Sequence, residues 1–334
     1  RQRAAGRPLT KIVFYLDQDF TGITKGGGDL KAAYEKKLLS VAAQNGVEIE
    51  WMAAGEIEIE LAQLEYQYIA EYYFAESQGL IDLIRVLDER TFANLSRIRT
   101  KFCVSVPPVD RSSELRTLAA MADGQVLVVE GVGGVGKSAV VKQYLCGLKP
   151  VDGPRRQVDV YFLTVEDAVG LLVSRELRAT WKTSLKSFLS VHADVPVRVL
   201  VIDSAEHLEG SSRLNEIVDV IREFSASGWR VICTTRPFFA LPLGDVLKEA
   251  GLTVGLRLNV RTLEQHQVDD VLSSYGVPSG VWASLRDALS VPLYLDLYLR
   301  MALQGDGSSC ATISAWKDCL WRRLIQGGVA TSSR

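Results

Sequence analysis

Eight consecutive residues, Gly131 to Ser138, have the composition and spacing of a phosphate-binding loop. They read GVGGVGKS and fit the pattern G-x-x-x-x-G-K-[ST]. Glycines are needed because successive backbone N–H groups can converge on phosphate oxygens only where no side chain blocks the approach. The Lys137 ammonium would bind the terminal phosphates, and the Ser138 hydroxyl would be a ligand of Mg²⁺. The motif therefore predicts binding of a nucleotide together with Mg²⁺.

The residues on both sides of the loop support this interpretation. The apolar run 126–129 (VLVV) predicts a buried strand before the loop. A helix is expected from about Lys137, and its N-terminal dipole would favour phosphate. The alternative, a glycine-rich turn with a chance Lys-Ser pair after it, accounts for neither neighbour. The predicted nucleotide-binding residues of the loop are Gly131, Val132, Gly133, Gly134, Val135, Gly136, Lys137, Ser138 and Ala139.

Two carboxylates follow the apolar run 199–202 (VLVI). A buried strand that ends in Asp is the pattern by which phosphate-loop ATPases place a carboxylate beside the loop hydroxyl, so Asp203 is predicted to order Mg²⁺ with Ser138. The alternative for Asp203 is a cap of the following turn. Glu206 could act on the water that attacks the γ-phosphate, as base or orienting group. It could also be an exposed glutamate at a helix start.

An arginine follows the third apolar segment, 229–234 (WRVICT), in the stretch Thr234-Thr235-Arg236-Pro237. Ligands of open α/β folds bind at the carboxyl ends of the strands, so Arg236 is predicted to contact the γ-phosphate through its two-pronged guanidinium. A solvated arginine is the alternative. The predicted catalytic residues are thus Glu206, Lys137 and Arg236. The three histidines, His192, His207 and His266, have no partners at metal-ligand spacing.

The overall composition is that of a globular protein, with 47% hydrophobic and 23% charged residues. The net charge of −2 gives no electrostatic footprint for nucleic acid. Five cysteines without C-x-x-C spacing predict buried thiols in a reducing compartment. We expect a cytoplasmic protein without a membrane partner, because no apolar run is long enough to cross a bilayer. The start without Met leads us to expect a piece of a longer polypeptide.

The order of predicted elements places the motifs in an α/β fold. We expect a P-loop NTPase core with a parallel sheet and helices on both faces over 106–260, preceded by a small α/β unit over 1–105 and followed by a helical lid over 261–334. Strands are predicted at 11–16, 47–51, 126–129, 158–163, 199–203, 229–234 and, at the sheet edge, 254–258. Helices are predicted at 30–44, 80–98, 113–121, 181–191, 214–226 and 313–325, and another, apolar nearly all round, from Pro292. The segment 55–74 fits either period, but its length favours a helix.

The first unit contains carboxylates at Asp17, Asp19, Glu48 and Glu50. A nuclease of the restriction-endonuclease-like kind would need an acidic residue and a Glu-x-Lys pair to hold its metal. Glu50 is followed by Trp51 and Met52, so solvated faces of a small α/β unit are the favoured interpretation.

The residues from about Pro107 to Ile325 resemble the STAND class of ATPases, a signal-transducing group that contains the NACHT and apoptotic-ATPase families. The resemblance is carried by GVGGVGKS at 131–138, VLVIDSAEHL at 199–208, VICTTRP at 231–237 and VPLYL at 291–295. Family members typically have Gly-x-Pro in the last stretch, with the proline against the adenine. Here Ser290 replaces the glycine and Pro292 remains. The resemblance implies that Pro292 contacts the base and that ATP or ADP binds with Mg²⁺.

The resemblance also implies a switch. ADP would hold a closed monomer, and a trigger, such as a viral protein, would permit exchange for ATP. The ATP form would be a homo-oligomer that brings N-terminal effectors together, and such an effector could act on nucleic acid. The trigger would be recognised by regions outside this chain. Bacterial proteins of this build commonly serve antiviral defence, so that role is expected here.

Two other classes of function share the same motifs. An AAA-type ATPase that remodels DNA or protein would hydrolyse ATP steadily without a trigger. A nucleotide-stabilised scaffold would need no catalytic Glu206. A GTPase is disfavoured because no N-K-x-D base-recognition motif follows the core.

Overall fold

The computed structural model describes residues 11–15, 30–52, 59, 78–100, 109–148, 157–255, 257–276, 285–303 and 314. The chain divides into two compact units. The first is Arg1–Glu89, Lys149–Asp159 and Gly170–Arg198, and the second is Arg90–Leu148, Val160–Val169 and Val199–Arg334. The predicted segments 55–74 and 313–325 lie outside the described residues, apart from Ile59 and Ser314.

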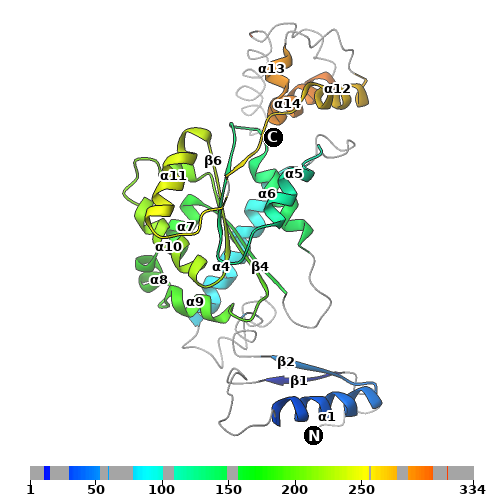
Figure 1. The fold of residues 1–334 in the computed structure, drawn as a ribbon, viewed down its shortest axis with the longest axis vertical. Helices are drawn as coiled ribbons and strands as arrows, with labels where there is room; N and C mark the ends of the chain where they lie inside the picture. The colour runs from blue at the N-terminus through cyan, green and yellow to red at the C-terminus, as the bar shows by residue number, and fades with distance from the viewer. Residues whose placement is uncertain are drawn as a thin grey trace, which may run out of the picture. The chain divides into compact units, whose positions relative to one another are not determined.

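The first unit begins with a β-α-β arrangement. β1 (Lys11–Tyr15) and β2 (Glu48–Met52) pair in parallel and are joined through α1 (Leu30–Gln44) (Figure 1). A parallel pair needs such a crossover, because both strands must start at the same end. After α1, Gly46 adopts a φ of +65°, a conformation in which glycine commonly ends helices. The two strands and the helix predicted here are confirmed.

The helix predicted over 181–191 is wrong in its first turn, because α9 (Leu185–Val191) begins later. Its N-cap is Ser184, whose hydroxyl accepts a hydrogen bond from the Ser187 N–H (3.1 Å). Lys182 has a left-handed φ of 52°, which a right-handed helix cannot contain. Two short helices that the sequence analysis missed, α7 (Val165–Leu172) and α8 (Ser174–Thr180), precede this turn.

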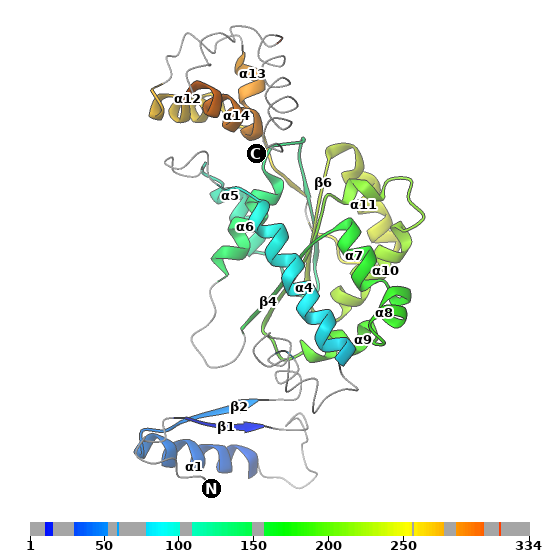
Figure 2. The same cartoon turned by 180° about the vertical axis from the view of Figure 1, so that it is seen from behind.

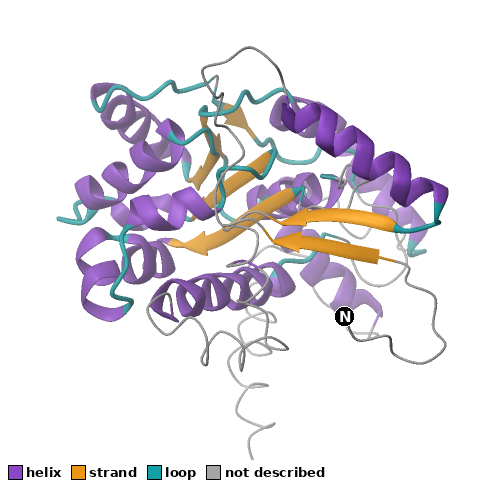
Figure 3. Cartoon of the chain, turned by 90° about the horizontal axis from the view of Figure 1, so that it is seen from below, coloured by secondary structure: helices purple, strands orange, loops and turns teal. Residues whose placement is uncertain are grey.

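A five-stranded sheet forms the centre of the fold and is drawn among its helices in Figure 3. Its order is β4 (Val158–Thr164), β5 (Val197–Asp203), β6 (Arg230–Thr235), β3 (Val126–Glu130) and β7 (Leu258–Asn259). β3 pairs in parallel with β6 and β7, and β5 pairs in parallel with β6. The central strands are nearly all apolar because both faces of the sheet are covered. The edge strand predicted over 254–258 is confirmed only in part, because β7 has two residues and overlaps this range at Leu258 alone, while Val254 makes an isolated bridge to Val126.

Helices cover both faces of this sheet. α5 (Ser112–Ala119) and α6 (Lys137–Gly147) lie on one face, and α10 (Leu214–Ala226) and α11 (Pro237–Glu249) lie on the other (Figures 1 and 2). The sequence analysis missed α11, because Pro242 normally breaks a helix. Burial of Phe239, Leu243 and Leu247 outweighs that preference. The chain therefore has the predicted α/β P-loop NTPase fold.

The edge strand β4 is covered by side chains of α4 (Gln78–Arg97). Thr91 Oγ1 accepts a hydrogen bond from the Phe162 N–H (3.0 Å), and Asn94 Nδ2 donates one to the Phe162 carbonyl oxygen (3.1 Å). These two side chains satisfy the backbone groups that a further strand would otherwise pair with. Helix α4 is thus attached to the sheet by specific polar contacts. The boundary predicted near residue 105 would instead assign this helix to the N-terminal domain.

The C-terminal helices form a small apolar cluster in the second unit. α12 (Gln265–Ser274), α13 (Arg286–Leu289) and α14 (Pro292–Leu303) follow the sheet. The buried side chains that they share include Val268, Leu272, Leu289, Leu295 and Leu299. Helix α14 is not buried all round as predicted, because Leu293 and Tyr294 in its first turn are exposed. We refer to α12–α14 as the lid.

Two cysteines lie among the described residues. Cys233 in β6 is buried, and burial raises the pKa of its thiol to about 12. Cys146 is exposed, so the prediction that all the cysteines are buried is wrong at this position. Within the described part of the chain, no helix combines the length and the apolar character that crossing a membrane requires.

The contact between α4 and β4 can be tested by Thr91→Val, which keeps the side-chain shape but removes the hydroxyl. The buried Phe162 N–H then loses its acceptor, so the free energy of unfolding should fall by about 1–3 kcal/mol. Urea denaturation measures the change, with Thr117→Val on the exposed face of α5 as control. Equal stabilities of the two variants would contradict this role of Thr91.

Candidate functional site

The phosphate-binding motif forms the turn between β3 and α6. Gly136 is the N-cap of α6 with a φ of 98°, and Gly134 has a φ of 79°. Residues with side chains rarely adopt these values. A Cβ at Gly131 would lie 2.7 Å from the Val260 carbonyl oxygen. Three of the four glycines are therefore required by the backbone or by close packing, which agrees with the predicted loop.

The Lys137 ammonium lies over this loop, where Nζ donates a hydrogen bond to the carbonyl oxygen of Gly131 (2.8 Å). Burial lowers the pKa of Lys137 below its usual value, and Arg236 acts in the same direction. The carboxylates of Glu206 and Asp203 have the opposite effect on that pKa. Two cations and two carboxylates thus share one region. A phosphate bound there would stabilise the charged form of both cations.

The hydroxyls of Ser138 and Thr234 meet the carboxylate of Asp203. Ser138 Oγ and Thr234 Oγ1 each donate a hydrogen bond to Asp203 Oδ1, and both distances are 2.7 Å. Thr234 Oγ1 also accepts one from the Ser204 N–H (2.9 Å). Ser204 has a left-handed φ of 62°, which is strained for a residue other than glycine and is typical of functional sites. The structure thus brings together the two predicted Mg²⁺ residues, Ser138 and Asp203.

The donor set of this group fits Mg²⁺. A serine hydroxyl and an aspartate carboxylate are hard oxygen ligands, and Mg²⁺ commonly binds through one or two such protein groups, waters and phosphate oxygens. Among the described residues, no group of three His, Cys, Asp or Glu side chains could hold a metal by itself. A Mg²⁺ ion bound at Ser138 and Asp203 would therefore depend on the nucleotide for part of its coordination.

Glu206 and Arg236, for which the sequence predicts separate roles, form an ion pair. Arg236 Nε donates to Glu206 Oε1 (3.1 Å), and the side chains are 54% and 10% exposed respectively. The second oxygen, Glu206 Oε2, is buried and has no hydrogen-bond partner among the described residues. A buried carboxylate oxygen without a partner is costly, so it indicates a group that a ligand or water is meant to satisfy. Glu206 lies in the short 3₁₀ helix η3 (Ala205–Leu208) after β5.

Several of these residues line a cavity of about 630 Å³. Its lining includes the loop from Gly133 to Val140, together with Glu206 and Arg236. The lid contributes Pro292 and Leu293, and the stretch Arg97–Thr100, which begins at the last residue of α4, forms a further part of the wall. All these residues belong to the second unit. Pro292, predicted to contact the base, is therefore a lining residue of the same cavity as Lys137.

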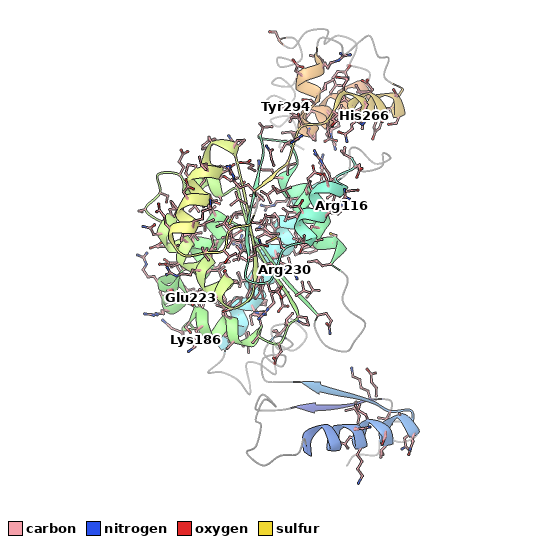
Figure 4. The ribbon with its side chains drawn as sticks, in the orientation of Figure 1. Arg116, Lys186, Glu223, Arg230, His266 and Tyr294 are labelled. Atoms are coloured by element: carbon pink, nitrogen blue, oxygen red, sulfur yellow. The ribbon has the colours of Figure 1, made fainter. Side chains whose placement is uncertain are left out.

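The lid contacts the loop directly through its backbone. The Leu293 N–H donates a hydrogen bond to the Gly134 carbonyl oxygen (3.1 Å). A Cβ at Gly134 would lie 2.8 Å from the Leu293 Cβ, so no larger residue fits there without moving α14. Figure 4 labels the next residue, Tyr294, at the start of this helix. The lid and the phosphate-binding loop are thus packed together at one glycine.

Sequence reasoning missed three contributors to this site. The sequence predicted no role for Thr234, although it orients Asp203 through a hydrogen bond. Arg111 lines the cavity, and its neighbour Glu114 is paired with it, a pattern that in sequence resembles an ordinary i,i+3 helix pair. The stretch Arg97–Thr100 carries no motif. By contrast, His207 is exposed and pairs with Glu166, as expected of a surface histidine.

Comparison with known proteins gives similarity to solved structures only. No model of a protein family matches the sequence, and no curated protein matches it. AMPPCP-bound DnaA from Aquifex aeolicus is 13% identical, with 64% of this chain and 65% of that chain covered and a TM-score of 0.40. The Aeropyrum pernix ORC1 protein in complex with DNA is 14% identical, with 67% and 68% covered and a TM-score of 0.44. The S. cerevisiae Hsp104–ADP complex is 16% identical, with 73% and 36% covered and a TM-score of 0.40. These likenesses concern the fold alone, and the alignments leave out about a third of the DnaA chain and most of the Hsp104 chain.

The position of Thr234 between Ser204 and Asp203 can be tested by Thr234→Val. This change leaves the Ser204 N–H without its acceptor, so the free energy of unfolding should fall by about 1–3 kcal/mol. The neighbouring Thr235 is the matched control, because its buried hydroxyl has no hydrogen-bond partner among the described residues. Thr235→Val should be neutral or slightly stabilising in urea denaturation. Equal destabilisation by the two changes would contradict the role given to Thr234.

Proposed function

We propose that the chain binds and hydrolyses ATP with Mg²⁺. The observation that carries this proposal is the hydrogen bond between Ser138 Oγ and Asp203 Oδ1 (2.7 Å) beside the Lys137 ammonium. A hydroxyl from the loop and a carboxylate from a separate strand meet where the motif requires the metal of a metal–nucleotide complex. A glycine-rich turn without this function would need neither the carboxylate nor the cation.

Each residue of the site has a distinct part in the proposed reaction. The loop amides and Lys137 would hold the phosphates, and Ser138 and Asp203 would hold Mg²⁺, which would neutralise charge on the phosphate oxygens. The buried Oε2 of Glu206, which no described residue hydrogen-bonds, is the acceptor that would orient or deprotonate the attacking water. Arg236 would exchange its contact with Glu206 Oε1 for the γ-phosphate, where charge develops during the reaction.

The finer part of the proposal is that hydrolysis resets a signalling switch. Support comes from the resemblance to STAND ATPases and from the direct contact between the lid and the loop, Leu293 N–H to Gly134 O. A lid that contacts the nucleotide-binding loop can give ATP and ADP different affinities for two conformations. The implied partners are a trigger, such as a viral protein, a homo-oligomer in the ATP form, and an N-terminal effector that could act on nucleic acid. The implied role is antiviral defence.

A second candidate is an AAA-type ATPase that remodels DNA or protein. The same site would serve it, and its signature would be steady turnover without a trigger, whereas a switch should hydrolyse ATP slowly. The scaffold hypothesis predicts nucleotide binding without hydrolysis. Glu206 Oε2 is buried and has no hydrogen-bond partner in the described part of the chain, which favours the two enzymatic hypotheses over the scaffold.

The nucleotide-binding proposal predicts that Lys137→Ala abolishes binding of ATP and ADP. The ammonium supplies the charge that the terminal phosphates require, and alanine cannot replace it. Lys186→Ala, at an exposed position labelled in Figure 4, is the control. Fluorescence titration with a labelled ATP and mass analysis of co-purified nucleotide provide the two measurements. A folded Lys137→Ala protein with unchanged affinity would refute the assignment of the loop.

The catalytic proposal separates Glu206 from Asp203. Glu206→Gln should bind ATP normally and hydrolyse it about 10²–10⁴-fold more slowly, because a positioned proton acceptor is lost. Asp203→Asn should weaken Mg²⁺-dependent binding as well as turnover. In a switch, the Gln variant should also accumulate as an ATP-bound assembly. Single-turnover hydrolysis and sedimentation of the same sample decide between the outcomes. Wild-type hydrolysis in the Gln variant would contradict a catalytic role of Glu206, and slow hydrolysis without assembly would favour an ordinary ATPase.

A further inference from the structure

Arg111 connects three segments of the second unit that are far apart in the sequence. Its Nη1 donates hydrogen bonds to Glu114 Oε1 (2.9 Å) and to the carbonyl oxygen of Arg261 (3.0 Å). Its Nη2 donates to the carbonyl oxygen of Val135 (3.3 Å). Glu114 is in α5, Val135 is in the phosphate-binding loop, and Arg261 is in the stretch that leads from β7 to the lid. One guanidinium therefore joins the loop to the start of the lid.

The surroundings of Arg111 make this connection rigid. Its side chain is only 9% exposed and that of Glu114 is 12% exposed. Burial alone would raise the pKa of Glu114, but hydrogen bonds from Ser113 and Arg111 outweigh it and hold that pKa below its usual value. The carboxylate therefore stays ionised at neutral pH and balances the buried guanidinium. A buried, paired arginine with three acceptors has little freedom to turn away.

The contact with Val135 bears on phosphate binding through the geometry of one peptide group. The carbonyl of Val135 and the N–H of Gly136 belong to the same planar unit, so holding the oxygen in place fixes the direction of the N–H. Gly136, the N-cap of α6, has a left-handed conformation and no side chain of its own to restrain it. Backbone N–H groups at this point of the loop are the ones expected to bind phosphate.

We propose that Arg111 is a positioning residue that orients the Gly136 amide toward phosphate and transmits the state of the loop to the lid through Arg261. This inference rests on the proposed nucleotide binding at the loop. Leu293 N–H to Gly134 O is a second link between the same two parts. Two consecutive carbonyl groups of the loop are thus bound: that of Gly134 by the Leu293 N–H of the lid, and that of Val135 by Arg111, which also binds Arg261 just before the lid. A change in loop conformation would change both contacts at once.

The test uses Arg111→Ala, Arg111→Lys and the control Arg116→Ala. Arg116 is an exposed arginine of α5, labelled in Figure 4, and its contact to the Ser112 carbonyl oxygen lies outside the site. Fluorescence titration with a labelled ATP should show about tenfold weaker binding for Arg111→Ala, since a hydrogen bond from a charged donor is lost. Arg111→Lys keeps the charge but cannot bond to all three acceptors, so its affinity should lie between those of Arg111→Ala and wild type.

Hydrogen exchange measured by mass spectrometry tests the link to the lid. In the wild type, saturating ATP and Mg²⁺ should slow exchange in peptides from both the loop and the lid. In Arg111→Ala at saturation, the loop should be protected while the protection of α12 and α14 is lost. A purely structural role would instead speed exchange throughout the second unit, with and without nucleotide.

The outcomes separate this inference from the proposed function. If the wild type fails to bind nucleotide, the proposed function fails and the inference fails with it. If the wild type binds nucleotide and Lys137→Ala does not, the proposed nucleotide binding stands. The Arg111 variants then test the positioning role of Arg111 separately. An Arg111→Ala protein with the affinity of Arg116→Ala and full protection of the lid would overturn the inference. Should Arg111→Ala fail to fold, the same two measurements on Arg111→Lys decide the matter.

Discussion

The hydrogen bonds that converge on Asp203 Oδ1 are the interaction on which the site depends. Ser138 belongs to the loop helix, Thr234 to β6 and Asp203 to β5, so one carboxylate oxygen ties the loop helix to two paired strands at their carboxyl ends. In the sheet, β6 lies between β5 and the loop strand β3. Thr234 on β6 is therefore placed to hold the Asp203 carboxylate in position beside Ser138. Without a donor on β6, the carboxylate would have one partner fewer to fix its direction.

The electrostatics of the cavity are balanced within the second unit. Lys137 and Arg236 face Asp203 and Glu206, so the positive charge needed to hold phosphates is already compensated by carboxylates. The Glu206–Arg236 pair has an exposed arginine and a nearly buried glutamate, which makes the arginine the member that can move. Such a pair keeps both groups ordered and leaves each available to a ligand. In the proposed reaction, they would separate as Arg236 turns toward the γ-phosphate.

The loop, its flanking strand and helix, and the position of Asp203 could be predicted from the sequence because each depends on local pattern. Gly136 and Gly134 are required by their own dihedral angles, and the apolar strands are required by burial on both faces of the sheet. Thr234 and Arg111 could not be assigned roles, because the contacts that define those roles span 31 residues (Thr234 to Asp203) and 24 residues (Arg111 to Val135) and depend on the tertiary fold. Helix α11 was not predicted, because Pro242 disfavours a helix in the sequence. Burial of apolar side chains of this helix against the rest of the fold offsets the free-energy cost of the proline. The exposure of Leu293 likewise depends on how α14 meets the loop.

The cover that α4 gives to β4 has a consequence for how the chain reaches its fold. Strand β4 is made before β5, its neighbour in the sheet, so a growing chain would for a time present an apolar strand with no partner. Thr91 and Asn94 precede Phe162 by about seventy residues and can occupy its N–H and carbonyl as soon as it is synthesised. Backbone groups that are already bound at Phe162 are not available there to a strand of another chain. Helix α4 would therefore close one edge of β4 at Phe162 during synthesis, and the other edge would stay open until β5 pairs with it.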